Sequence, residues 1–360
     1  MEKYLKQLRN KHLRKRKGKN PNYPIASWTQ DDIFRDGTIG KSITIILRTV
    51  GCKYAYNTGG CTMCSYLMDS SPVEITSENI INQFNSVIDK YKKEIIENSK
   101  NYSIKLFTSG SFLDDFEVQK EGMEYIFKTI GELNIKEVAI ESRCEYITEE
   151  NLKLIRKYIN NNNNINVEIG LGIETTNEEI RNNSIHKGVS NKDIENTIKL
   201  ANNYNVGIKG YLLIKPLFIT EKEAINDAIK SANQCIKLGV SRISFCPATI
   251  HKGSLMELIW QKNQYRPPFL YSIIEILKEV KSKNLDSLIM CDTSGIPSLR
   301  GSHNIKDCSC NFKIKELIED FTITQDLSLL EEFNFNCNCK DYWKEYIKYE
   351  QKNIVPLGEL

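Results

Sequence analysis

The sequence predicts an α/β fold in which parallel strands and crossover helices form a partial, TIM-like (β/α)6 barrel. One observation is a regular alternation, in which short apolar runs typical of buried strands are followed by longer amphipathic segments typical of helices. The other is that a polar, charged or glycine-containing cluster follows nearly every apolar run, where a barrel gathers its active site. A chain of 360 residues, 40% hydrophobic and 26% charged, is large enough to bury such a core. A doubly wound open sheet is the structural alternative.

The chain begins with a basic N-terminal arm. Its first 20 residues hold nine Lys or Arg and one acid, so the arm carries +8 and the remaining 340 residues carry −5, for a net charge of +3. Such an uneven charge is typical of nucleic-acid contact, and a solvated, partly disordered terminus is the alternative. Residues 1–20 can form one helix. Residues 18–40, with their glycines, prolines and asparagines, predict an extended connection.

The barrel elements follow in order. Apolar runs predict six parallel strands, at residues 43–48, 103–108, 136–141, 166–172, 208–215 and 241–246. Amphipathic patterns predict helices near residues 77–98, 118–132, 149–159, 190–204, 220–238 and 268–284. Successive strand–helix units imply right-handed crossovers. We therefore expect an arm and connection at 1–40, a barrel at 41–286, and a small module at 287–360 that starts with a possible last strand at 287–290.

Three cysteines follow the first predicted strand within thirteen residues, namely Cys52, Cys61 and Cys64. Thiolates at this density suit zinc or an iron–sulfur cluster better than they suit hard cations. Three thiolates are one short of a closed site, so either a distant residue completes a zinc site or one metal position stays open for chemistry. The location after a barrel strand favours the open iron–sulfur site. Eleven cysteines in a chain without a signal-peptide core also favour metal ligation over a disulfide framework.

The residues in and after the other strands predict a polar cavity beside this cysteine loop. They are small, charged or hydroxyl-bearing side chains, a proline, and a glycine that lets a ligand approach the backbone: Thr108, Ser109, Gly110, Glu141, Arg143, Glu174, Lys209, Tyr211 and Pro247. Each alone is weak evidence, since Glu141 is equally well a surface carboxylate or the partner of Arg143. Together they describe a cavity for a ligand with amine, carboxylate and ribose groups.

The C-terminal module contains two Cys-x-Cys pairs, formed by Cys308, Cys310, Cys337 and Cys339. Four thiolates suffice for a closed structural zinc site, in which Cys291 or His303 can replace one ligand. A second iron–sulfur cluster and reduced thiols are the alternatives, because ligands so close in sequence strain a tetrahedral site. We expect the remaining cysteines to be buried hydrophobic side chains, at Cys144, Cys235 and Cys246.

Several motifs together resemble one known family. They are Leu47 to Cys52, Gly60 to Tyr66, Phe107 to Phe112, Tyr265 to Pro268 and the late cysteine pairs. In these the chain resembles the radical S-adenosylmethionine (radical SAM) superfamily, and specifically the radical subunits of archaeosine synthase, relatives of the Elongator-type radical enzymes. The spacing C-x8-C-x2-C departs from the C-x3-C-x2-C that is commonest in the superfamily and agrees with the narrower group.

The resemblance implies a radical SAM barrel in which the three cysteines after the first strand hold a 4Fe–4S cluster and leave one iron free for S-adenosylmethionine. Ser109 and Gly110 would lie near the methionine amine, while Glu141 and Arg143 are candidates for the ribose hydroxyls and the methionine carboxylate. Further contacts to the cofactor would come from the other strand-end residues listed above and from Tyr66. One-electron reduction would yield a 5′-deoxyadenosyl radical that the protein positions and shields.

The resemblance also implies a function in tRNA modification. The expected activity is a radical C–N lyase that converts the lysine adduct of 7-cyano-7-deazaguanine in the tRNA D-arm to archaeosine. Its partners would be tRNA, a lysine-transferring subunit and a low-potential electron donor. The alternatives are another Elongator-like radical SAM enzyme acting on tRNA, and a non-catalytic iron–sulfur or RNA-binding subunit. Because no apolar run is long enough to span a bilayer, we expect a cytoplasmic protein.

Overall fold

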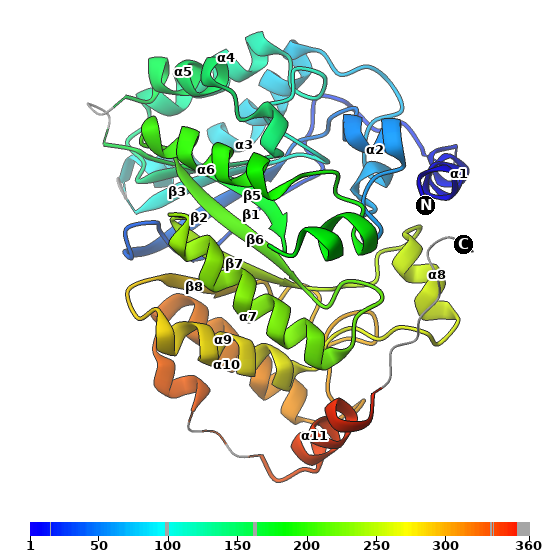
Figure 1. The fold of residues 1–360 in the computed structure, drawn as a ribbon. Coiled ribbons are helices and arrows are strands. Elements are labelled where there is room, and N and C mark those ends of the chain that lie inside the picture. The colour runs from blue at the N-terminus through cyan, green and yellow to red at the C-terminus, as the bar shows by residue number, and fades with distance from the viewer. Residues whose placement is uncertain (15, 98–100, 161–163, 332, 334, 351–360) are drawn as a thin grey trace.

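One eight-stranded sheet, curled into a half-barrel, organises the computed structural model of the chain (Figure 1). The structure describes residues 1–14, 16–97, 101–160, 164–331, 333 and 335–350. The strand order is β1 to β8, with β1 antiparallel to β2 and each later neighbouring pair parallel. Consecutive parallel strands bring their carboxyl ends to one rim of the sheet. The predicted α/β barrel class is confirmed.

The six predicted strands and the possible last one all form. They are β2 (Ile39–Ile46), β3 (Tyr102–Phe107), β4 (Glu137–Ser142), β5 (Asn166–Glu174), β6 (Gly207–Ile214), β7 (Arg242–Pro247) and β8 (Leu288–Cys291). The edge strand β1 (Ala26–Ile33) lies where we expected an extended connection. Only its last two residues are buried, so it has no apolar run or alternation by which the sequence could reveal it.

The predicted crossover helices also form, as α3 (Ser77–Glu97), α4 (Lys120–Glu132), α5 (Glu149–Tyr158), α6 (Asn191–Asn203), α7 (Glu221–Lys237) and α9 (Leu270–Lys283). Hydroxyl caps begin several of them. The Thr148 side chain accepts from Asn151 N at the start of α5, and Ser190 and Thr220 form capping boxes at α6 and α7. Apolar side chains of these helices and of the strands form one continuous core.

Shorter elements surround the rim of the sheet. They are α2 (Lys53–Thr58), α8 (Leu255–Gln261), the single turns η1 (Tyr66–Met68) and η2 (Cys144–Tyr146), and the π-helical turn η4 (Ile180–Ser184). The N-terminal helix α1 (Glu2–Leu13) lies beside α2 (Figure 1). At the other end of the chain come α10 (Cys310–Thr324), η5 (Leu327–Leu330) and α11 (Cys339–Tyr349). Among the described helices, none is both long and apolar enough to cross a membrane.

Buried ion pairs close the amino end of the barrel. Arg242 contacts Glu137 at 2.5 Å and Glu168 at 2.7 Å, and Lys105 contacts Asp32 at 2.8 Å. All five side chains are at least nine-tenths buried. Each charge has an opposite partner, as burial requires. The amino end of the barrel is therefore closed by paired charges, opposite the rim where the strands have their carboxyl ends.

The C-terminal segment begins as part of the sheet. Its first element, β8, pairs in parallel with β7, from Arg242↔Leu288 to Phe245↔Cys291. The division of the chain into an arm, a barrel and a C-terminal module stays a prediction. Lys15 of the arm and residues 351–360 of the module lie outside the described residues.

Candidate functional site: a cysteine loop and a polar cluster at the carboxyl rim

The cysteine loop follows β2 and is built around the short helix α2. Cys52 is the N-cap of this helix, and Gly59 ends it with a φ of +87°. Gly60 follows with a φ of +78°. Two successive left-handed residues turn the chain back on itself at no steric cost only because both are glycine. The turn brings Cys61 and Cys64 to the same side of the loop as Cys52.

The three thiols share one environment. Burial raises the pKa of the Cys52 thiol to about 12, with smaller contributions from Glu117 and Cys64. Burial also raises the pKa of Cys61, where Lys187 opposes the shift and Cys64 adds to it. The thiols therefore lie close enough to interact electrostatically, and metal ligation is what would keep such buried groups deprotonated. All eleven cysteines of the chain are free.

Helix α1 lies against this loop from the outside. A Cβ at Gly59 would come within 2.6 Å of the Leu5 carbonyl carbon and of Lys6 N, so backbone meets backbone here. The Arg9 guanidinium donates to Gly59 O at 3.2 Å and to Cys64 O at 2.8 Å. Arg9 is only 4% exposed. One residue of the basic arm is thus a buried brace for the cysteine loop rather than part of a solvated charge run.

The segment after η4 holds the loop from the other side. Tyr54 donates its hydroxyl to His186 O at 2.9 Å, and His186 Nδ1 donates to Gly60 O at 3.0 Å. Arg143 stacks 4.0 Å from the centre of the Tyr54 ring and donates to Lys187 O at 3.0 Å. The loop is therefore fixed at both flanks, which keeps the relative positions of its thiols constant.

The end of β3 comes closest to the first cysteine. A Cβ at Gly110 would lie 2.7 Å from Cys52 Cβ and would collide with the Glu117 carboxylate. Glu117 accepts from Thr49 Oγ1 at 2.8 Å and from Ser111 N at 2.7 Å, and burial raises its pKa to about 7. Sequence reasoning missed Glu117, which precedes α4 in a segment that resembles an ordinary acidic turn.

The middle of the rim holds a group of buried and half-buried polar side chains, which we call the polar cluster. Glu174, in the left-handed region at φ +64°, pairs with Lys187 at 2.8 Å. Burial raises the pKa of Glu141 to about 7, while a hydrogen bond from Tyr211 opposes the shift. Tyr66 is 54% exposed, and partial burial together with its neighbours Cys64, Glu141, Cys246 and Asp292 raises its pKa. Tyr66 therefore lies at the edge of the polar cluster.

The remaining predicted residues lie in or just after β3, β6 and β7. Thr108 and Ser109 are buried at the end of β3, and the Thr108 hydroxyl accepts from Gly110 N at 3.2 Å. Lys209 lies deeper, where burial and then Lys105 and Arg242 lower its pKa to about 8. Pro247 ends β7.

Of the three cysteines expected to be buried, Cys235 is buried, whereas Cys144 and Cys246 are half-buried. The pKa of the Cys246 thiol is raised by burial and then by Asp292 and Glu174. Cys246 therefore lies next to the polar cluster.

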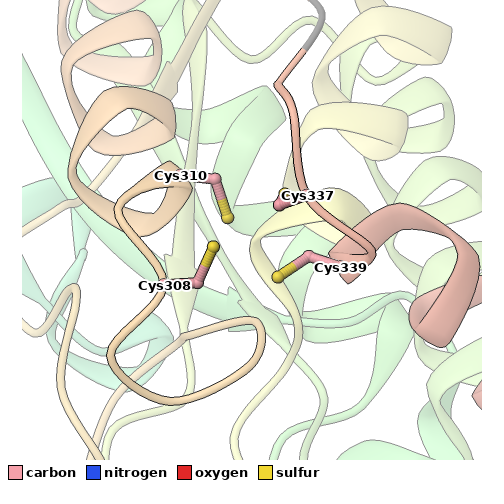
Figure 2. A group of neighbouring side chains, drawn as sticks. All are labelled: Cys308, Cys310, Cys337 and Cys339. Carbon is pink, nitrogen blue, oxygen red and sulfur yellow. The ribbon is translucent and has the colours of Figure 1, made fainter.

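The second cysteine group has a different geometry. Among the described residues, Cys308, Cys310, Cys337 and Cys339 are the group of possible metal ligands whose ligand atoms all lie within 4.8 Å of one another. Figure 2 shows the four side chains converging from two chain segments. The cysteine loop offers three thiols rather than four, one short of a closed site for a single ion. Three thiolates are the number that leaves one iron of a 4Fe–4S cluster without a cysteine ligand.

Comparison with known proteins agrees with this geometry. A model of the radical SAM superfamily matches residues 46–228. Archaeosine synthase subunit beta of Methanosarcina acetivorans is 36% identical over 91% of this chain and 91% of its own length. The chain belongs to the radical SAM superfamily. Membership implies enzymatic radical chemistry with a 4Fe–4S cluster and S-adenosylmethionine.

Other similar proteins fit the same radical SAM assignment. Archaeosine synthase subunit beta of Thermococcus kodakarensis is 35% identical over 90% of this chain and 96% of its own length. An uncharacterized protein of Methanocaldococcus jannaschii is 64% identical over 99% of this chain and 95% of its own length. The solved structure of Methanocaldococcus infernus Elp3 matches with a TM-score of 0.50 at 15% identity, over 69% of this chain and 59% of that one. This last likeness concerns the fold alone.

The residues of this radical SAM chain fit both implied groups. The three thiols are soft donors on one braced loop, and only a glycine at position 110 lets the backbone after β3 approach Cys52 this closely. The adjoining polar cluster offers carboxylates, a lysine and hydroxyls, which suit the amine, carboxylate and ribose of S-adenosylmethionine.

Proposed function

We propose that this chain is the radical subunit of an archaeosine synthase and acts as a radical C–N lyase on tRNA. Its substrate would be the lysine adduct of 7-cyano-7-deazaguanine in the D-arm, and its product archaeosine. The observation that carries the proposal is near full-length similarity, at 36% and 35% identity, to two proteins named archaeosine synthase subunit beta. The word subunit in those names supports a partner, which we propose is the lysine-transferring protein.

In this proposal Cys52, Cys61 and Cys64 ligate the 4Fe–4S cluster. When bound, the cluster and S-adenosylmethionine supply a primary carbon radical that abstracts hydrogen from the lysine moiety. The task of the protein is to hold the thiols at fixed separations, which the contacts of Arg9, Tyr54 and His186 with the loop support. A fixed loop also limits the entry of water and oxygen.

The polar cluster and the residues beside Cys52 would orient S-adenosylmethionine. Gly110 and Ser109 lie beside Cys52, so they would receive the methionine amine, with Thr108, Tyr66 and Glu117 close by. Arg143 would attract the methionine carboxylate, because its side chain lies on the Tyr54 ring of the cysteine loop. Ribose hydroxyls would bond to Glu141 or Glu174, and Tyr211, Pro247 and the deeper Lys209 would line the remaining space.

The proposal also includes the charged partners. The exposed lysines of α1 would contact tRNA phosphates, and a low-potential donor would deliver the electron to the cluster. The C-terminal four-cysteine group would hold zinc, as argued below. We propose that the protein acts in the cytoplasm, where tRNA is available.

The test is reconstitution of the purified protein without oxygen, followed by reduction with S-adenosylmethionine and tRNA that carries the lysine adduct. We expect 5′-deoxyadenosine and archaeosine to appear together, and both to depend on Cys61. Mass spectrometry of the digested tRNA identifies the nucleoside. If 5′-deoxyadenosine forms while the lysine adduct stays intact, the chain is a radical SAM enzyme with another substrate. A stable cluster without any cleavage would instead make it a supporting subunit.

A further inference from the structure

The C-terminal cysteines lie at the starts of two helices that are distant in sequence. Cys308 and Cys310 precede and begin α10, and Cys337 and Cys339 precede and begin α11. Cys310 and Cys339 are each 1% exposed, while Cys308 and Cys337 are half-buried. The four sulfur atoms are within 4.8 Å of one another, without a disulfide between them. Four free thiols rarely gather so closely unless something holds them together.

This spacing decides between the metals that four thiolates can hold. A tetrahedral ion with metal–sulfur bonds of about 2.3 Å places its four sulfur atoms about 3.8 Å apart. The ligands of a 4Fe–4S cluster bind four different iron atoms and are therefore spread more widely. The group is too tight for a cluster and close to the size for a single ion. Four thiolates in a closed tetrahedron are typical of structural zinc.

The surroundings provide the second layer of contacts that such sites use. Asn304 Nδ2 donates to Cys310 Sγ at 3.6 Å. Asn304 is itself fixed, because its Oδ1 accepts from Leu270 N at 3.1 Å and its backbone N–H donates to Asn311 Oδ1 at 2.8 Å. The sulfur of Cys310 is thus oriented from the start of α9. Neighbouring donors of this kind stabilise thiolate ligands.

Helix α11 is attached to the rest of the chain near this group and through contacts of its side chains with α9. It has 11 residues, of which only Cys339 is fully buried, and a helix of this length is marginal by itself. Trp343 Nε1 donates to Oγ of the buried Ser272 at 2.8 Å, and the half-buried Tyr346 ring packs 4.9 Å from that of the buried Phe269. An ion that joins α11 to α10 would therefore fix the first residue of the helix in addition to these contacts.

The position of α11 matters at the carboxyl rim. Glu350, which follows α11, lies 3.7 Å from Lys215 Nζ and accepts a hydrogen bond from Glu221 N. Lys215 comes directly after β6 and is only 2% exposed. Tyr346 and Glu350, with Lys215 and Trp260, line a cavity of about 420 Å³. The helix therefore completes a wall beside the end of a barrel strand.

We propose that Cys308, Cys310, Cys337 and Cys339 bind one zinc ion and that this ion anchors α11 at the end of β6. The site is closed and takes no part in the radical chemistry. This inference does not depend on the proposed substrate.

The experiment measures zinc and iron separately in the full chain, purified after growth with zinc and reconstituted with iron and sulfide. We expect one zinc per chain in the wild type and in Cys235→Ser, a control at a buried cysteine outside both groups. The double variant Cys308→Ser/Cys339→Ser should lose the zinc and keep the cluster iron and its visible absorbance. Retained cluster iron shows that the barrel has folded, so loss of zinc then reports on the site itself.

Hydrogen exchange tests the anchoring. In the double variant, exchange of residues 339–349 should accelerate at least roughly tenfold while that of β5 and β6 stays unchanged. Zinc retained in the double variant, iron in place of zinc, or four thiols that titrate freely in the zinc-grown wild type would overturn the metal assignment. Unchanged exchange in α11 after zinc loss would overturn the anchoring.

Discussion

The two cysteine groups of this chain show how ligand number and spacing separate two kinds of metal site. The cysteine loop offers three thiols from one segment, beside the polar cluster at the carboxyl rim. The C-terminal group offers four thiols from two segments, all within 4.8 Å of one another. Three thiolates leave a metal position open for chemistry, whereas four in a closed tetrahedron favour a structural role. The same residue type thus serves two purposes, according to its geometry.

The largest expected effect separates the two groups completely. Cys61→Ala should reduce cluster iron and 5′-deoxyadenosine formation to background, because two thiolates cannot hold a cluster in this loop. Zinc content should stay at the wild-type value. The measurement is metal analysis with a cleavage assay, and Cys144→Ala is the control, a half-buried cysteine in neither group. A Cys61→Ala protein that still cleaves S-adenosylmethionine contradicts the assignment of the loop.

The reverse substitution should have a smaller and different effect. Cys339→Ser should leave the cluster in place but lower the stability of the C-terminal segment by about 3 kcal/mol, a fall of roughly 5 °C in a melting transition. Scanning calorimetry under anaerobic conditions measures it. Adding zinc should raise the transition of the wild type and not that of the variant. Equal melting temperatures for the two proteins would mean that the group carries no ion of structural importance.

How much of this contrast the sequence could predict depends on what each pattern encodes. Apolar runs predicted the parallel strands because those strands are buried on both faces. They could not predict β1, whose residues Ser27 to Asp31 remain exposed or half-buried. Spacing identified both cysteine groups, but not the separations between their sulfur atoms, which decide between a cluster and an ion.

Residues outside a strand end were the hardest to predict. Arg9 was counted among the charges of the basic arm, for which we expected nucleic-acid contact or a solvated terminus, although it is 4% exposed and braces the cysteine loop. Glu117 and Lys187 reach the rim from connecting segments, which lack the periodic pattern of apolar residues that identifies strands and helices. The contact of Arg9 with Cys64 joins residues 55 positions apart and that of Glu117 with Thr49 joins residues 68 apart, and one sequence contains no signal of such pairings.

Arg9 sharpens the comparison, because it joins the arm to the cysteine loop, and no such contact between the arm and the C-terminal cysteines is found among the described residues. Arg9→Ala should leave the cluster able to form but make it bleach in air roughly three- to tenfold faster, because two loop carbonyls lose a charged donor. Visible absorbance after exposure to air measures the rate. Arg14→Ala is the matched control, an exposed arginine that follows the same helix. Zinc release should be the same in all three proteins, and equal bleaching rates would rule out the brace.

The smallest expected effect concerns the exposed lysines of α1. In our proposal these lysines contact tRNA, whereas the C-terminal cysteine group has no role in binding tRNA. Lys3 and Lys11 are exposed, whereas Arg9 on the same helix is buried. Lys3→Gln/Lys11→Gln should weaken tRNA binding by roughly two- to fivefold at moderate salt and reduce the slope of log K against log salt by about 1 to 2, since each lysine would neutralise about one phosphate. Cluster stability in air should not change, which is the opposite of the Arg9→Ala result. Fluorescence anisotropy with labelled tRNA at several salt concentrations measures the slope. An unchanged slope would place the RNA contact elsewhere and leave α1 with its inward role alone.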